Sequence, residues 1–411
     1  MLKNKKVLLW MFLGFLFVAA VAIGIAIPFM ISVTNSSPLT STTTPTPTSP
    51  STTSTLASTT STLASTASAS TTSASASTTS TTTTTTPSRS QKGKLMIVGG
   101  AIYNGANVHY NTTEIIDLDH ENSICQLTTE YPHQASNIQA GVLNVSANPK
   151  VIFCGGISDD GIASLSCFEY SLDEFHSMNN LTNQAVRSAS AVQMFEDFEE
   201  QFLWITGGSR QSRTQLVSYS KVLEGPEIPI PNKEIVHHCV VALKSTTVMI
   251  IGGQISSYDS SETFWYDFDS GQWMQGPELS IARERHACSV FESEDELRIY
   301  VTGGYNDVTG NLDSVEIAVL DQDNILAMNW KWIEGPRLLF RTREHAQVST
   351  KSGVYVIGGL EGDDYCYSDS IFELNLLSEK STWIKIPQKM KVPRSYVAAL
   401  ILPEESPISC Q

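Results

Sequence analysis

Six times along the chain, a run of four mostly apolar residues leads directly into a pair of glycines. The clearest copy runs from Val248 to Ile251, before Gly252 and Gly253. An apolar run of this length predicts a strand buried on both faces, and glycine lets the backbone turn through positive φ where the strand ends. A β-rich unit repeated about every 50 residues predicts a β-propeller with one blade per repeat. The pairs begin at Gly99, Gly155, Gly207, Gly252, Gly303 and Gly358, at steps of 56, 52, 45, 51 and 55 residues.

Two further features recur in most repeats. A strand rich in small residues precedes the apolar run, as in His286 to Val290, and small side chains suit the crowded innermost strand of a blade. A tryptophan and a Gly-Pro turn follow it, as in Trp273 to Pro277 and Trp332 to Pro336. In this order the features resemble the kelch repeat, over residues 93 to about 403. The resemblance implies an all-β protein folded as a six-bladed kelch-type β-propeller.

The two ends of the repeat region complement each other. The chain enters at Lys94 on an apolar second strand, with no small-residue strand before it. It ends with such a strand, Arg394 to Pro403, and no glycine pair after it. We therefore expect both ends to share one blade, with the C-terminal strand innermost, because closing the ring removes exposed strand edges.

The N-terminal region predicts a membrane anchor. Residues 7–33 carry no charge and are long enough to cross ~30 Å of hydrocarbon. Three lysines precede them within residues 1–6, which places that short tail in the cytosol by the positive-inside rule. A cleaved signal peptide is the alternative, but the run exceeds the roughly 7–15 residues of a signal core. The propeller is then extracellular or in the lumen of the secretory pathway.

A stalk and a short tail complete the predicted organisation. Residues 34–92 are almost entirely Ser, Thr, Ala and Pro until residue 90, which predicts a mucin-like stalk or, alternatively, a bare flexible linker. The propeller spans 93–403, and 404–411 form a tail. Sequons that agree with export lie at Asn111, Asn144 and Asn180.

The charge distribution excludes one class of partner. All 42 acidic residues and 22 of the 26 basic residues follow residue 91, which gives this part a net charge of −20. Such a surface repels nucleic-acid backbones, so we expect no nucleic-acid partner. Contact with membrane is expected through residues 7–33 alone.

Seven cysteines in an oxidising compartment predict disulfides. Cys154 and Cys167 lie on adjacent strands of one hairpin, where opposed residues come close enough to bond, so we expect this pair to staple a blade. Cys125 and Cys410 both belong to the closing blade and form a second candidate pair. Cys239 and Cys288 sit one register apart on two inner strands, so we expect them to face opposite ways as buried thiols.

The sequence offers little support for catalysis. His238, His286 and His345 share one repeat position, which permits either a metal site on the axis or half-buried rings at a rim. Some kelch propellers resemble galactose oxidase, but the two Tyr and two His of that copper site cannot be assembled from this chain. We therefore expect no cofactor, no catalytic residues and no metal, with an exported enzyme, galactose-oxidase-like or glycan-processing, as the alternative.

Binding needs fewer special residues. In kelch propellers that bind peptides or proteins, the resemblance implies contacts from the loops after Gly-Gly and from the arginine that begins the inner strand. An arginine ring could bind carboxylates, although each arginine could equally pair with an acid of a neighbouring blade. The expected function is recognition of a protein or glycan by a membrane-tethered module. The candidate binding residues are Arg187, Arg283, Arg394, Arg210, Tyr258, Tyr305 and Asp307.

Overall fold

A computed structural model describes most of the chain from residue 92 to residue 404. The described segments are 92–121, 129–145, 148–182, 190–193, 201–208, 213–230, 234–243, 246–294, 296–322, 325, 330–363, 366–378 and 381–404. Every regular element in them is a β-strand. No helix among them is long and apolar enough to span a membrane. Residues 7–33, which we expect to do so, lie outside the described part.

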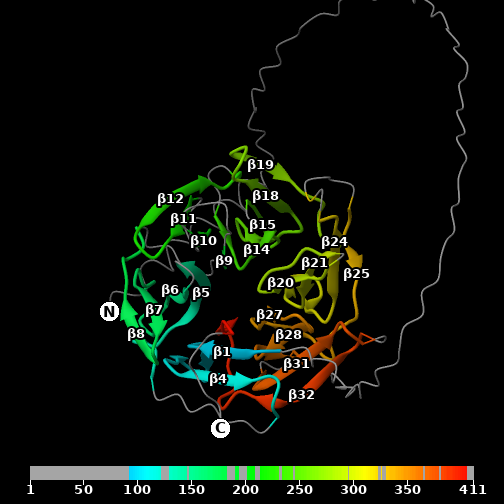
Figure 1. Ribbon diagram of the computed structural model, residues 1–411. Helices are drawn as coiled ribbons and strands as arrows, with labels where there is room; N and C mark the ends of the chain where they lie inside the picture. The colour runs from blue at the N-terminus through cyan, green and yellow to red at the C-terminus, as the bar shows by residue number, and fades with distance from the viewer. Residues whose placement is uncertain are drawn as a thin grey trace, which may run out of the picture. The chain divides into compact units, whose positions relative to one another are not determined.

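Six sheets are arranged in a ring about a central axis (Figure 1). Each sheet is one blade, and its strands are given in order from the axis outwards. Blade 1 contains β33 (Ala398–Ile401), β1 (Lys94–Val98) and β4 (Thr113–Asp117). Blade 2 contains β5 (Ser136–Val145), β6 (Asn148–Ile157), β7 (Cys167–Ser171) and β8 (Glu174–Ser177). Blade 3 contains β9 (Ser190–Gln193), β10 (Leu203–Thr206), β11 (Arg213–Val217) and β12 (Val222–Glu227). Blade 4 contains β14 (Cys239–Leu243), β15 (Thr247–Ile251), β18 (Thr263–Asp267) and β19 (Gln272–Gln275). Blade 5 contains β20 (Ala287–Glu292), β21 (Leu297–Thr302), β24 (Val315–Leu320) and β25 (Ile333–Glu334). Blade 6 contains β27 (Ala346–Ser349), β28 (Gly353–Ile357), β31 (Ser370–Asn375) and β32 (Trp383–Lys389).

The closure predicted from the sequence is confirmed. Strand β33 pairs antiparallel with β1, from Leu95 opposite Ile401 to Val98 opposite Ala398. The C-terminal strand is the innermost strand of blade 1, and the N-terminal strands lie outside it. The ring is thereby closed by non-covalent pairing of its two ends.

The apolar runs form the second strand of each blade and are buried between neighbouring blades. All five residues of β15 are buried. Met249 of blade 4 packs in one cluster with Ile299 and Val301 of blade 5. Burying a side chain of this size stabilises the fold by roughly 1.5–3 kcal/mol, so these interfaces hold the ring together.

The glycine pairs allow neighbouring blades to approach closely. Gly252 and Gly253 have φ of +55° and +96°. A Cβ on Gly252 would lie 2.9 Å from Cε1 of His286 and 3.0 Å from the carbonyl oxygen of Arg283, both at the entrance to the next blade. The glycine pair therefore ends the strand and leaves room for the segment that leads into the inner strand of the next blade.

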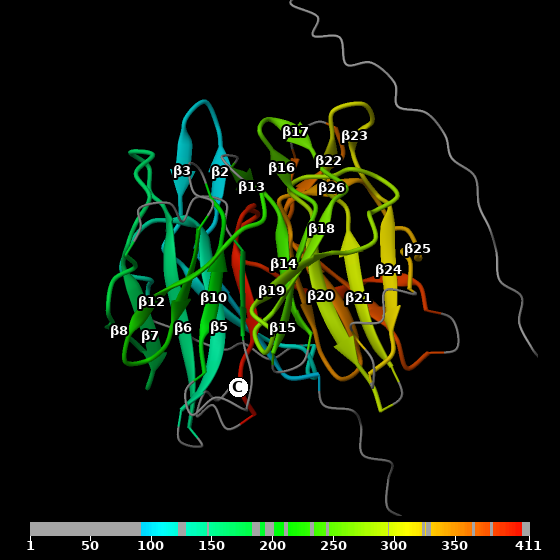
Figure 2. The same cartoon turned by 90° about the horizontal axis from the view of Figure 1, so that it is seen from above.

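The loops that follow the glycine pairs all leave from one end of the blades, which we call the loop face (Figure 2). Short strands line it, among them β2 (Ala101–Tyr103), β3 (Asn107–His109), β13 (Ile235–Val236), β16 (Gln254–Ile255), β17 (Tyr258–Asp259), β22 (Tyr305–Asn306), β23 (Gly310–Asn311), β26 (Thr342–Arg343), β29 (Leu360–Glu361) and β30 (Cys366–Tyr367). Strand β1 runs toward this face because its last residue precedes Gly99. The chain therefore enters the propeller from the opposite face.

Candidate functional site

The loop face opens into a pocket of about 600 Å³. Its rim includes the β2–β3 hairpin, the loop after β6, and β29 and β30. A smaller space of about 210 Å³ adjoins it and is lined by the starts of the inner strands. Residues that line both spaces form the floor of the pocket. They are Asn137, His237, Arg285, Glu344 and Tyr396.

These five residues, which we call the left-handed ring, share one backbone conformation. Their φ values, in the same order, are 55°, 54°, 54°, 59° and 53°. Each lies within two residues of the start of its inner strand, in blades 2, 4, 5, 6 and 1 respectively. For a residue with a Cβ, this conformation costs roughly 1–2 kcal/mol, and it is especially unusual for bulky side chains.

The backbone compensates part of this cost through hydrogen bonds from blade to blade. The amide of Arg285 donates to the carbonyl of His237 at 2.9 Å, and that of Glu344 donates to Arg285 at 2.9 Å. The amide of Tyr396 donates to Glu344 at 2.9 Å, and that of Asn137 donates to Tyr396 at 3.1 Å. The left-handed conformation thus links successive blades around the axis.

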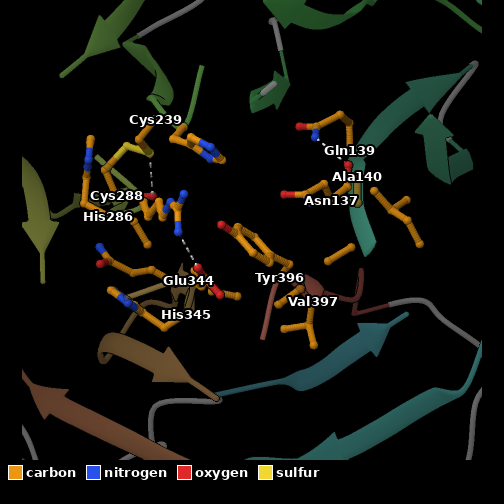
Figure 3. Close-up of a pocket in the computed structure, with 18 of the residues that line it drawn as sticks. Asn137, Gln139, Ala140, Cys239, His286, Cys288, Glu344, His345, Tyr396 and Val397 are labelled. Atoms are coloured by element: carbon orange, nitrogen blue, oxygen red, sulfur yellow. Dashed lines mark hydrogen bonds and ion pairs between the residues drawn. A yellow bond between two sulfur atoms is a disulfide. The ribbon is translucent and has the colours of Figure 1, made fainter. Parts of the chain in front are cut away.

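The side chains of the ring form a polar, partly aromatic floor. Nη1 of Arg285 lies 3.0 Å from Oε1 of Glu344, and its Nε lies 3.3 Å from Glu284. The hydroxyl of Ser395 donates to the other oxygen of Glu344 at 3.0 Å. Burial and the adjacent Glu344 raise the pKa of Tyr396 well above its ordinary value, so its hydroxyl stays protonated. Tyr396 and Asn137 point into the open centre (Figure 3).

Two of the predicted binding arginines are structural, which corrects the expectation from the sequence. Arg283 and Arg394 are each 0% exposed. Arg283 donates to the carbonyl of Gly303 at 2.8 Å and to Glu316 at 2.8 Å. Nη1 of Arg394 lies 2.8 Å from Glu114. Each arginine joins its inner strand to the third strand of its own blade and offers no surface to a ligand.

The remaining predicted residues lie around the pocket or outside the described part. Tyr258 is 75% exposed at the tip of the β16–β17 hairpin. The Tyr305 ring lies 5.0 Å from the guanidinium of Arg343, and the Asp307 amide donates to Asp259 at 2.6 Å. None of these three predicted residues lines the pocket. Arg187 and Arg210 lie outside the described residues.

The three repeated histidines act as wedges between neighbouring blades. Nε2 of His238 lies 2.7 Å from the hydroxyl of Thr206, and Nε2 of His345 lies 2.8 Å from that of Thr302. Nε2 of His286 contacts the carbonyl of Ile251 at 3.1 Å. Each imidazole ring therefore forms a hydrogen bond with the preceding blade, at the residue directly before that blade's glycine pair. Within the described residues no cluster of His, Cys, Asp or Glu is suited to hold a metal ion.

Two disulfides join cysteines within the described residues, one expected and one not. Cys154 and Cys167 are bonded across β6 and β7, as hypothesised. Cys239 and Cys288 are also bonded, so the expectation of two free thiols was wrong. The two residues do face opposite sides of their own blades, but the blades are neighbours in a ring, and opposite faces meet at the interface. Cys125 and Cys410 lie outside the described part of the chain.

The predicted glycosylation sites differ in accessibility. Asn180 is exposed. Asn111 is partly buried, and its amide donates to Glu130 at 2.8 Å. Asn144 lies on β5, and its side chain is outside what the structure describes.

Sequence reasoning missed the left-handed ring, although a signal was present. His286 and His345 are equivalent repeat positions, and the residues directly before them are Arg285 and Glu344. A position that varies chemically between copies while its neighbours repeat is a candidate for recognition. The repeated arginines favoured a different set of binding residues, but their repetition reflects a shared structural role.

The chain resembles proteins with kelch repeats over part of its length. No family model matches it. A protein of Arabidopsis thaliana described as an F-box/kelch-repeat protein is 34% identical over 77 residues, which are 19% of this chain and 21% of that protein. Kelch-like protein 40a of Danio rerio is 27% identical over 136 residues, 32% of this chain and 21% of that protein. The chain thus spans about a fifth of the length of these relatives. The solved structure of YjhT aligns with 64% of this chain and 87% of its own, with a TM-score of 0.47 and 14% identity.

Proposed function

The chain is a kelch-repeat protein, and on that premise we propose that it binds a protein partner through the pocket on its loop face. The left-handed ring is the observation that supports this function. Glycine would occupy these five positions without strain, yet the chain places His, Arg, Glu and Tyr at four of them. Retained backbone strain points to side chains that are needed for function.

A protein ligand fits the rim of the pocket better than a glycan does. Large apolar side chains stand exposed at the tips of the loop face, including Tyr103 at 64% and Tyr258 at 75%. Exposed aromatic residues grouped around a polar pocket are typical of protein interfaces. The sequence also allowed a glycan ligand. Binding of the chain to glycans that carry no protein would support that alternative.

We further propose that the module is tethered to a membrane and displayed outside the cytosol. The uncharged residues 7–33 behind three lysines support an anchor with its N-terminus in the cytosol. The two disulfides support an oxidising compartment. Such a tether would join the propeller through Lys92, just before β1, whose far end leads to the loop face.

Proximity labelling on cells that display the full chain tests the proposal. The wild type is compared with His237→Ala/Tyr396→Ala, which removes two ring side chains. The control is Leu172→Ala/Leu377→Ala, which removes two exposed side chains of connecting turns away from the pocket. We expect one or more labelled surface proteins to be lost in the ring variant alone. The same labelled set from all three chains would contradict the proposal.

A further inference from the structure

A histidine that lines the pocket is held by an aspartate of the neighbouring blade. His109 ends β3, on the hairpin that projects from the loop face (Figure 2). It lines the pocket of about 600 Å³, and its side chain is 7% exposed. Asp159 lies in the loop after β6, and its side chain is 49% exposed. The pair therefore joins blade 1 to blade 2 beside the pocket.

Two nitrogens of His109 donate to the same carboxylate oxygen. Its backbone amide lies 2.9 Å from Oδ1 of Asp159, and Nδ1 of its ring lies 2.6 Å from that oxygen. These hydrogen bonds hold the pKa of Asp159 below its ordinary value, so the carboxylate is ionised and can only accept. In the neutral imidazole, Nδ1 therefore carries the proton, and Nε2 is an acceptor.

Nε2 of His109 is available to a ligand. It has no hydrogen-bond partner among the described residues and, unlike Nδ1 of the three repeated histidines, it is not buried. The contacts with Asp159 fix the orientation of the ring, and a carboxylate bonded to the opposite ring nitrogen makes a histidine more basic. The residue thus offers the pocket an oriented acceptor that lacks a donor.

The charges around His109 favour a cationic donor. Asp160 follows Asp159 directly, and hydrogen bonds lower its pKa as well, so two ionised carboxylates adjoin the imidazole. The basic residues that line the pocket, Arg285 and Arg343, belong to blades 5 and 6 rather than to the two loops that hold this pair. The positive charge of a lysine or arginine is attracted to the two carboxylates, whereas a carboxylate of the partner would be repelled.

We propose that His109 accepts a hydrogen bond from a lysine or arginine side chain of the protein partner, and that Asp159 positions its imidazole for this contact. The inference rests on the proposed function, because it specifies the chemistry of one contact within the same pocket. Ile162, which is 64% exposed and follows the lining residue Gly161, offers contact area for the apolar stem of that side chain. A purely structural bridge between the two loops would use only the amide and Nδ1, so substitution can separate the two roles.

A double-mutant cycle with selected peptides tests the contact. A phage-displayed library of random twelve-residue peptides is selected on the full chain in detergent, and each lysine or arginine of a selected peptide is replaced by methionine in turn. Affinities are measured for the wild type and for His109→Asn, whose amide can still donate to Asp159 but which has no atom at the position of Nε2. We expect one replacement to weaken binding to the wild type by about tenfold or more, and binding to His109→Asn by less than about twofold.

His120→Asn is the matched control. The amide and Nδ1 of His120 likewise contact a single carboxylate, that of Asp117, at 3.2 and 3.0 Å, and His120 does not line the pocket. We expect this variant to show the same dependence on the peptide's lysine or arginine as the wild type.

The remaining outcomes separate this inference from the proposed function. Peptides without lysine or arginine, or equal losses in the wild type and His109→Asn for every replacement, would overturn the inference alone if binding still requires His237 and Tyr396. If His109→Asn binds no peptide, His109→Gln decides, because its longer amide places an acceptor near the position of Nε2. Binding restored with its dependence on lysine or arginine is then expected, and its absence would overturn the inference. Peptides that bind the ring variant as tightly as the wild type, or failure to select any peptide, would overturn the inference and the proposed function together.

Discussion

Backbone geometry and side-chain chemistry conflict at the floor of the pocket. Four residues with large side chains adopt a conformation that glycine prefers, and the blade-to-blade hydrogen bonds of their backbones persist whatever the side chain is. Strain and recognition can therefore be measured separately by substitution at a single position.

His237 offers the simplest comparison. His237→Gly and His237→Ala both remove the imidazole, but only the alanine keeps a Cβ at φ of 54°. We expect the glycine variant to exceed the alanine variant in free energy of unfolding by about 1 kcal/mol. Urea unfolding of the full chain measures the difference, and an alanine variant at least as stable as the glycine one would show that the position is unstrained.

The histidine wedges make the fold sensitive to acid. Burial lowers the pKa of His238 to about 4 and that of His345 to about 3, and it holds that of His286 well below its ordinary value. Nδ1 of each ring is buried with no acceptor in the described structure, and Arg283 adds positive charge near His286 and His345. Protonation would therefore place an unsatisfied N–H and a charge at three successive blade interfaces.

The sign of the pH dependence follows from these pKa values. Below pH ~6.5 the histidines of the unfolded chain bind protons that the folded chain excludes, so stability falls as the pH drops from 6.5 toward 4. By pH 5, His238 and His345 each contribute a loss of about 2 kcal/mol to the free energy of unfolding. We expect His238→Gln to lose less melting temperature than the wild type between pH 7.5 and 5.0. Parallel losses in both proteins would show that His238 is not a determinant.

At the level of strands, the sequence predicted most of the fold because the repeat is long and regular. The glycine pairs, the apolar second strands and the pairing of β33 with β1 all lie where the pattern placed them. Errors arose where the outcome depends on packing between blades. Cys239 and Cys288 illustrate this, because their facing directions were correct but only the ring arrangement shows that those faces touch.

The two disulfides differ in what they connect. Cys154 and Cys167 close a segment of 13 residues within one blade, whereas Cys239 and Cys288 span 49 residues between the inner strands of two blades. The chain-entropy model gives about 3 kcal/mol for the shorter loop and about 4 kcal/mol for the longer one. We expect Cys239→Ser/Cys288→Ser to destabilise the full chain more than Cys154→Ser/Cys167→Ser in denaturant unfolding. A greater destabilisation by Cys154→Ser/Cys167→Ser would contradict this expectation.

At the level of the whole molecule, stability depends on closing the ring. Deletion of residues 394–411 removes β33, Arg394 and its ion pair with Glu114, and exposes the edge of β1. We expect the truncated chain to lose the cooperative thermal unfolding transition of the intact one. An unchanged melting curve would mean that the six sheets hold together without the latch.

Binding of a protein by the loop face is tested most directly by site-specific photocrosslinking. A photoreactive phenylalanine analogue replaces Tyr396 at the pocket floor, Tyr258 on the β16–β17 hairpin of the loop face, or Leu377 in the turn after β31, each in the full chain on cells. We predict crosslinks to the same partner polypeptide from positions 396 and 258, and none to it from position 377. Crosslinks that form from position 377, and from neither position 396 nor position 258, would contradict this function.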